Sequence, residues 1–292
     1  MQTTDQTQAE VSPKGWARVL LIFFPFLIVV GLFQLVGYLI LGLDLSNREF
    51  VQSPFQSMVV MFFTLGGTIF IIQLFRKHVD KESFQSMGFY PANLIKESIV
   101  GLVLGAAIMA VGFVSLILLG EIKWESTNFE PDSFLYSVGL FIAIAITEEL
   151  YMRGYVLNNL MKSMPRFAAL LVSSVYFSLM HVVNPHFSWF SFFDLTLAGM
   201  LLGFSYIYTK SLWFPIALHF SWNFFQGTIF GFPVSGKDLY SVIHQSHTTS
   251  NILNGGGFGF EGSILSVIFQ VIVIFFIWRF YTKRKIYPAG VD

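Results

Sequence analysis

The sequence predicts an all-α protein, a polytopic transmembrane helix bundle of about eight spans with both termini in the cytoplasm. Of its 292 residues, 54% are hydrophobic and only 12% are charged, whereas a soluble domain carries about 25% charged residues. A chain this apolar could not cover its surface with polar groups, so lipid must be its solvent. Apolar runs of about 20 residues, the length that crosses a bilayer as a helix, recur along the sequence.

Eight apolar segments fit this length and follow one another along the chain. The fifth segment is short and polar at its outer end, so it is the least well defined of the eight. The predicted spans are 17–42, 55–75, 97–120, 134–160, 167–184, 188–209, 213–232 and 262–281.

The Lys and Arg residues predict the orientation, because cytoplasmic segments of membrane proteins carry an excess of them. With the N-terminus inside, all but three of the 17 Lys and Arg residues fall on the cytoplasmic side of the chain or, for Arg153, in the inner part of the fourth span. The three on the outer side are Arg48, Lys123 and Lys237. An even number of spans with both termini inside fits this distribution.

The spans divide the chain into regions. We expect a polar N-terminal tail (1–15), N-terminal transmembrane helices (16–132) that include a basic cytoplasmic linker (76–96), a transmembrane core (133–282) and a basic C-terminal tail (283–292).

Two further features bear on the core. Residues 233–261 form a long, polar outer loop, which is either mobile or a partial lid. Gly199 and Gly203 form a GxxxG motif on the sixth span, which predicts close packing against another helix.

Composition excludes several classes of function. The formal net charge is zero, so no overall field favours a nucleic acid as partner. The chain contains no Cys, which rules out disulfides, thiolate metal sites and a cysteine nucleophile.

Three of the predicted spans carry charged or polar side chains, which are costly within a bilayer and are therefore functional candidates. The fourth span contains Glu148, Glu149 and Arg153. The fifth contains His181, and the seventh contains His219 and Asn223.

The spacing of these residues separates their roles. Side chains at i and i+4 share one face of a helix. Glu149 and Arg153 are four residues apart and have opposite charges. Arg153 is therefore predicted to keep Glu149 ionised and to fix the helix, so that the pair supports a site. Glu148 lacks such a partner. His219 and Asn223 again share a face.

Each polar residue also has a purely structural explanation. Glu149 and Arg153 can be an ion pair that holds the bundle together, and His181 can bond to a neighbouring backbone group. Asn223 can join two helices. The convergence of a carboxylate, two imidazoles and an amide at similar depth on three spans favours a shared site.

Three motifs in this order resemble those of the CPBP (CAAX protease and bacteriocin-processing) intramembrane proteases, also called type II CAAX prenyl endopeptidases or the Abi family. The stretches KSLWFPIALHFSWNF and GGGFGFEGS are similar to the same family, and the resemblance covers roughly 140–282. The motifs are Glu148-Glu149-x-x-x-Arg153, Phe177-x-x-x-His181 and His219-x-x-x-Asn223.

The resemblance implies that the core 133–282 hydrolyses a peptide bond within or beside the membrane. Amide hydrolysis needs an activated water and a stabilised oxyanion. Glu148 is predicted to be the base that activates the water and His181 to hold the water with it. His219 and Asn223 are predicted to donate hydrogen bonds to the oxyanion.

The sequence leaves the participation of a metal open. Glu148, His181 and His219 are the candidate ligands, because two His and one Glu hold the metal in some catalytic zinc sites, and the resembled family is often described as metalloproteases. Zn²⁺ is therefore the candidate cofactor. The HExxH motif is absent, however, and the same residues can activate water without a metal.

Two other functions stay open at this point. The same fold could serve as a non-catalytic immunity or scaffold protein, and intramembrane Glu and His residues also act as proton relays in transporters. The lack of internal repeats argues against a transporter. The predicted partners are membrane lipids and a protein or peptide substrate, with a prenylated protein as one candidate. The predicted location is the cell membrane, as a multi-pass protein.

Overall fold

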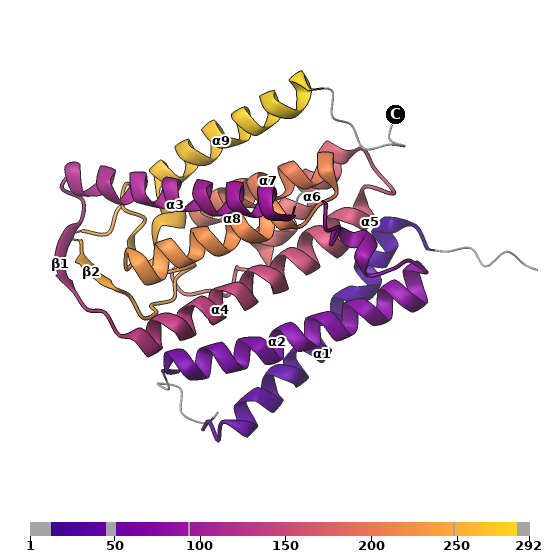
Figure 1. The fold of residues 1–292 in the computed structure, drawn as a ribbon, viewed down its shortest axis with the longest axis horizontal. Helices are drawn as coiled ribbons and strands as arrows, with labels where there is room; N and C mark the ends of the chain where they lie inside the picture. Colours follow the sequence, from indigo (N-terminus) through magenta and orange to yellow (C-terminus); the bar gives the residue numbers. More distant parts are fainter. Residues whose placement is uncertain (1–12, 45–50, 93, 248, 285–292) are drawn as a thin grey trace, which may run out of the picture.

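The computed structural model describes residues 13–44, 51–92, 94–247 and 249–284, which form a bundle of helices with a two-stranded sheet at one end (Figure 1). The predicted tails 1–15 and 283–292 lie almost wholly outside the described residues. The helices and strands are α1 (Gly15–Ile40), α2 (Pro54–Phe75), η1 (Arg76–Asp80), η2 (Gln85–Met87), α3 (Leu94–Leu118), β1 (Lys123–Thr127), α4 (Pro131–Glu149), η3 (Leu150–Leu157), α5 (Asn158–Leu160), α6 (Arg166–Leu179), α7 (Trp189–Thr209), α8 (Trp213–Phe224), η4 (Phe225–Ile229), β2 (Ile243–Ser246), η5 (Gly256–Phe258), η6 (Phe260–Gly262) and α9 (Ile264–Lys283).

The predicted all-α class is confirmed. Among the described residues, six helices are long and apolar enough to cross a membrane: α1, α2 continued by η1, α3, α4 continued to the end of α5, α7 and α9. The fifth predicted span is the shorter helix α6, and the seventh is α8 with its π-helical continuation η4. Because α6 has 14 residues, it is about 21 Å long, less than the ~30 Å of a bilayer core.

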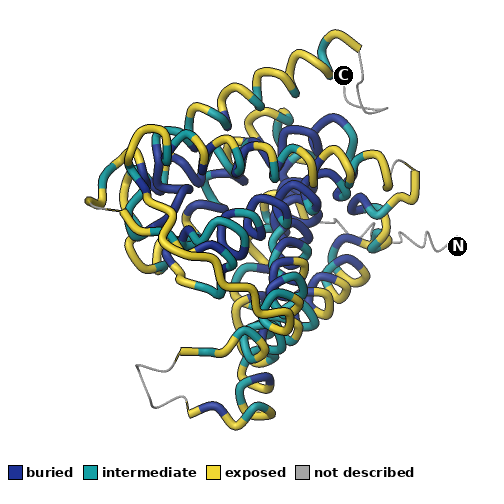
Figure 2. The backbone as a smooth tube through the Cα atoms, turned by 60° about the vertical axis from the view of Figure 1, so that its left-hand side comes forward, coloured by how far each residue is buried: buried dark blue, intermediate teal, exposed yellow. Residues whose placement is uncertain are grey.

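Burial distinguishes the outer helices from the inner ones (Figure 2). In the most apolar stretch of both α1 and α9, only 11% of the residues are buried, against 67% in α7. The exposed side chains of α1 and α9 are mainly Leu, Ile, Val and Phe, which lipid solvates and water does not. These two helices thus form the lipid-facing edge, and α7 lies in the interior.

Glycines allow the inner helices to approach closely. On α3, a Cβ added at Gly101 would lie 2.7 Å from the carbonyl oxygen of Phe214 on α8. The hydroxyl of Ser221 on α8 donates to the Leu102 carbonyl oxygen at 2.6 Å. Small residues and such bonds hold helices together in lipid, where hydrophobic burial drives association little.

The GxxxG motif on α7 has the packing role predicted for it. A Cβ at Gly199 would lie 2.8 Å from the Ser174 Cα on α6, and one at Gly203 would lie 2.6 Å from the Leu170 Cδ1. Contact with α6 therefore depends on the missing side chains of these two glycines.

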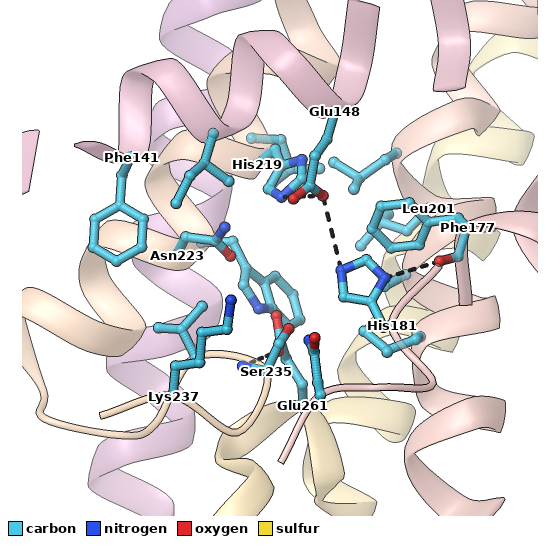
Figure 3. Close-up of a pocket in the computed structure, with 18 of the residues that line it drawn as sticks. Phe141, Glu148, Phe177, His181, Leu201, His219, Asn223, Ser235, Lys237 and Glu261 are labelled. Carbon is cyan, nitrogen blue, oxygen red and sulfur yellow. Dashed lines mark hydrogen bonds and ion pairs between the residues drawn. The ribbon is translucent and has the colours of Figure 1, made fainter. Parts of the chain in front are cut away.

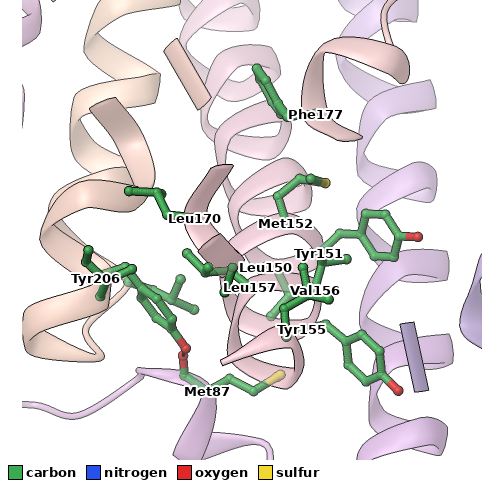
Figure 4. Close-up of a cluster of buried hydrophobic side chains, with 14 of the residues drawn as sticks. Met87, Leu150, Tyr151, Met152, Tyr155, Val156, Leu157, Leu170, Phe177 and Tyr206 are labelled. Atoms are coloured by element: carbon green, nitrogen blue, oxygen red, sulfur yellow. Dashed lines mark hydrogen bonds between the residues drawn. The ribbon is translucent and has the colours of Figure 1, made fainter. Parts of the chain in front are cut away.

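The predicted linker 76–96 packs closely against the bundle. Arg76 is fully buried and donates to Asp80 at 3.1 Å and to the Ser83 carbonyl oxygen at 2.9 Å. Met87 is buried in the main core cluster, and its carbonyl oxygen accepts a 2.7 Å bond from the Tyr206 hydroxyl (Figure 4). The segment therefore closes the end of the bundle at which α1 begins.

The opposite end is closed by the loop 233–261. Strand β2 in this loop pairs antiparallel with β1, which joins it to the connection between α3 and α4. Gly259 has a φ of +96°, and a Cβ there would lie 1.9 Å from the Pro233 carbonyl oxygen, so only glycine fits this crossing of the loop. Of the two alternatives left open for the loop, the structure therefore favours a lid.

We expect Gly199→Ala to destabilise the protein, because the new methyl would meet the backbone of α6. Overpacking of this kind costs about 1–3 kcal/mol. Gly31→Ala is the matched control, since no atom lies within 4 Å of its added Cβ. Thermal unfolding of both variants in detergent measures the difference, and an equal midpoint for both would contradict the packing described for α6 and α7.

Candidate active site

A cavity lies between α4, α6, α7, α8 and the loop that follows η4 (Figure 3). Its volume of about 120 Å³ is enough for several water molecules. The four residues predicted to be catalytic all contribute to its wall. The lining residues are Phe141, Ile144, Glu148, Phe177, His181, Asn184, Leu195, Ala198, Leu201, Leu202, Leu218, His219, Trp222, Asn223, Val234, Ser235, Lys237, Leu239 and Glu261.

Two consecutive carboxylates at the end of α4 have different surroundings. Successive residues of a helix point about 100° apart, so Glu148 and Glu149 face different neighbours. The Glu148 side chain is 31% exposed and lines the cavity, whereas the Glu149 side chain is fully buried. Directly after them the helix widens into the π-helical segment η3, a distortion that occurs often at functional sites.

Glu149 is the centre of a buried network. Its Oε1 accepts a 2.7 Å bond from Arg153 Nη1 and a 2.8 Å bond from His219 Nδ1. Arg153 Nη2 donates to the Gly199 carbonyl oxygen at 2.9 Å, and its guanidinium lies 4.9 Å from the centre of the Phe177 ring. The network thus joins α4 and η3 to α6, α7 and α8.

The hydrogen bonds of the two imidazoles indicate their tautomers. His181 Nδ1 lies 2.8 Å from the Phe177 carbonyl oxygen, which can only accept, so Nδ1 carries the proton. His219 Nδ1 donates in the same way to Glu149, whose charge is held by Arg153. In each neutral ring, Nε2 therefore has the lone pair.

Both Nε2 atoms face the carboxylate of Glu148. Its Oε2 lies 3.9 Å from His181 Nε2 and 3.7 Å from His219 Nε2. These distances exceed a direct hydrogen bond and are short enough for one water molecule to contact all three atoms. The arrangement has the polar partners that an ordered water requires.

Asn223 completes the set predicted from the sequence. It lies one turn after His219 on α8, and Figure 3 shows its side chain at the cavity beside Glu148 and His219. The structure thus brings Glu148, His181, His219 and Asn223 together, with Glu149 and Arg153 buried beside them.

The cavity also contains polar residues that the sequence did not single out. Glu261, in the 3₁₀ turn η6, accepts bonds from the Ser235 amide at 2.9 Å and from its hydroxyl at 2.7 Å. Burial raises the pKa of Glu261, and the bonds from Ser235 act in the opposite direction. Lys237 is exposed at the rim. The stretch GFEGS contained Glu261, but nothing local indicated that the loop folds back onto α8.

The candidate metal ligands are Glu148, His181 and His219. His181 and His219 direct unprotonated Nε2 atoms toward Glu148, as ligands would. Within residues 13–44, 51–92, 94–247 and 249–284, however, no group of three His, Asp or Glu side chains is arranged to hold a metal ion. The arrangement of Glu148, His181 and His219 therefore gives a metal-dependent mechanism no support.

Comparison with known proteins supports the resemblance. Residues 130–225 match the family model described as type II CAAX prenyl endopeptidase Rce1-like. The match covers about a third of the chain and includes all six predicted site residues, while Glu261 lies outside it. No significant match was found among curated proteins or among solved structures. Together with the apolar spans, the match supports an integral membrane protein that is similar to the CAAX proteases over residues 130–225.

We expect Glu149→Gln to destabilise the protein strongly, because it leaves Arg153 as a buried charge without its carboxylate. Breaking a buried pair in this way costs about 3–5 kcal/mol. Glu148→Gln is the matched control: its side chain is partly exposed, and its carboxylate is beyond hydrogen-bond distance from both imidazoles. We expect the control to stay within about 0.5 kcal/mol of wild type. The free energy of unfolding in detergent measures the difference. An equal loss of stability in both variants would contradict the assignment of Glu149 to the buried network and Glu148 to the cavity.

Proposed function

We propose that this chain, whose residues 130–225 match the type II CAAX prenyl endopeptidase Rce1-like family model, is an intramembrane endopeptidase that activates a water molecule with Glu148 and His181. The observation that carries the proposal is the gap between Glu148 Oε2 and the two Nε2 atoms of His181 and His219, at 3.9 and 3.7 Å. Glu148 and His181 can hold and deprotonate one water inside the cavity, and His219 faces the same point from α8.

The attacking water is held by two acceptors. Glu148 Oε2 and His181 Nε2 each accept one of its protons, which leaves a lone pair of the oxygen directed at the substrate. As that oxygen bonds to the scissile carbonyl carbon, Glu148 takes the proton. Glu148 then returns the proton to the amide nitrogen, and the carbon–nitrogen bond breaks to give an amine and a carboxylic acid.

The oxyanion formed in this step is stabilised from α8. Asn223 donates through its amide NH₂, and His219 donates through Nε2 when it carries a second proton. The resulting imidazolium is compensated by Glu149 on its Nδ1 side and by Glu148 on its Nε2 side. Arg153 keeps Glu149 ionised, so that Glu149 remains the acceptor that orients the ring.

The substrate approaches through apolar surroundings. A second cavity of about 240 Å³ lies between α1, α2, α4 and α6 and shares Glu148, Phe177 and His181 with the first. Its other lining residues include Phe26, Val30 and Met152. Such a lining suits a hydrophobic peptide segment or a lipid anchor, so a membrane-associated protein or peptide is the substrate class, with a prenylated protein as one candidate.

We expect Glu148→Gln to abolish proteolysis, with a loss of at least about 100-fold, because the amide cannot accept a proton from water. Mass spectrometry of the peptides released from membranes of cells that express each form measures this loss. Asp132→Asn on the same helix is the control, since Asp132 is exposed at the start of α4. Peptides that persist unchanged in the Glu148→Gln form would exclude Glu148 as the base and favour a non-catalytic protein.

Asn223→Ala should lower kcat by about 10²–10³-fold, the range seen when one oxyanion donor is removed. KM should change little, because the donor acts mainly on the transition state. Steady-state kinetics on a peptide found in the previous experiment separates the two parameters. A raised KM with an unchanged kcat would instead assign Asn223 to substrate binding.

A further inference from the structure

We propose that the cavity opens to the extracytoplasmic face of the membrane, so that the substrate presents its scissile bond outside the cytoplasm. The substrate class is then an exported or membrane-anchored polypeptide. Cytosolic proteins attached to the inner leaflet, including the prenylated candidate named above, fall outside it. This inference specifies the side from which the proposed protease works, and it rests on the proposed function.

The two ends of the bundle differ in charge. At the end that carries β1 and β2 (Figure 1), the described residues include only Lys123 and Lys237 as basic residues. Acidic residues predominate there, and two of them tie segments of that end together: Asn251 donates to Glu121, and Ser246 donates to Glu125.

The opposite end is basic. Contacts between chain segments there include Arg18 with Asp80, Lys162 with Glu82 and Lys210 with Asn158. Since cytoplasmic ends of membrane proteins carry the excess of Lys and Arg, this end is the cytoplasmic one. Its described basic residues are Lys14, Arg18, Arg76, Lys77, Lys81, Lys96, Lys162, Arg166, Lys210, Arg279, Lys283 and Arg284.

The rim of the cavity belongs to the acidic end. Ser235, Lys237 and Glu261 come from the loop that also contains β2, and Asn184 comes from the connection between α6 and α7. Lys237 is exposed, whereas Leu201 and Leu218 deeper in the cavity are buried. The second cavity shares Asn184 and Lys237, so both open near the same end.

Toward the basic end the cavity is sealed. Every residue from Leu150 to Leu160 is buried. Beneath them, Asp80 binds Arg76 at 3.1 Å and accepts a bond from Asn159 at 3.3 Å. Water and peptide therefore reach Glu148 from the acidic end or from the lipid, and not through the cytoplasmic end.

Cysteine labelling tests the orientation, because the chain contains no Cys and a single introduced thiol is read without background. Asp238→Cys places a thiol next to the rim, and Lys77→Cys places one at the basic end; both residues are exposed. With a membrane-impermeant maleimide on intact protoplasts, we expect Asp238→Cys to be labelled as fully as in lysed membranes and Lys77→Cys to be labelled only after lysis. The reverse pattern would overturn the inference. If Asp238→Cys reacts poorly even after lysis, Lys123→Cys on β1, also exposed, takes its place.

The position of the cleaved bonds tests the substrate class. Peptides that depend on wild-type protein and vanish in the Glu148→Gln form should map to extracytoplasmic or outer-leaflet segments of their parent proteins. Cleavage sites in cytoplasmic segments would overturn this inference and leave the proposed protease intact. If no such peptides exist but the labelling pattern is as expected, the proposed function fails and the orientation stands.

Discussion

The buried bond between Glu149 and its two partners, Arg153 and His219, is the constraint on which the rest of the site depends. A carboxylate with no exposed surface is tolerated in a membrane only when cationic or protonated groups surround it. Here these groups are the guanidinium of Arg153, whose Nη1 lies 2.7 Å from Glu149 Oε1, and the imidazole of His219, whose Nδ1 lies 2.8 Å from the same oxygen. Because Nδ1 of His219 is committed to this bond, its Nε2 must point to the cavity. The ion pair of Glu149 and Arg153 thus determines the direction of the His219 side chain on α8.

The same constraint connects packing to chemistry. Arg153 donates to the carbonyl oxygen of Gly199, the same residue whose missing side chain lets α7 approach α6. The π-helical turn η3 begins directly after Glu149 and lies wholly in the interior. Below it, the cluster around Arg76 and Asp80 closes the basic end of the bundle. The site is therefore held by buried polar bonds on one side and covered by the loop 233–261 on the other.

Much of this arrangement could be predicted from the sequence, because it rests on helical periodicity. The i, i+4 relation of Glu149 and Arg153, and the apolar surroundings of His181, were enough to predict a buried pair and a site shared by three spans. The bond from His219 to Glu149 could not be predicted, because spacing within α8 only relates His219 to Asn223. Glu261 and Lys237 were missed because a loop's path depends on distant contacts, such as the pairing of β1 with β2. Arg76 and Asp80 also stand four residues apart with opposite charges, but their burial was missed because they lie in a segment expected to be a basic cytoplasmic linker.

A high-resolution experimental structure of the wild-type protein in a lipid environment tests the central claim most directly. The account predicts an ordered water within hydrogen-bond distance, about 2.6–3.2 Å, of both Glu148 Oε2 and His181 Nε2, with His219 Nδ1 still bonded to Glu149. A direct bond between Glu148 and either imidazole, with no water between them, would contradict it. So would a His219 ring turned away from Glu149.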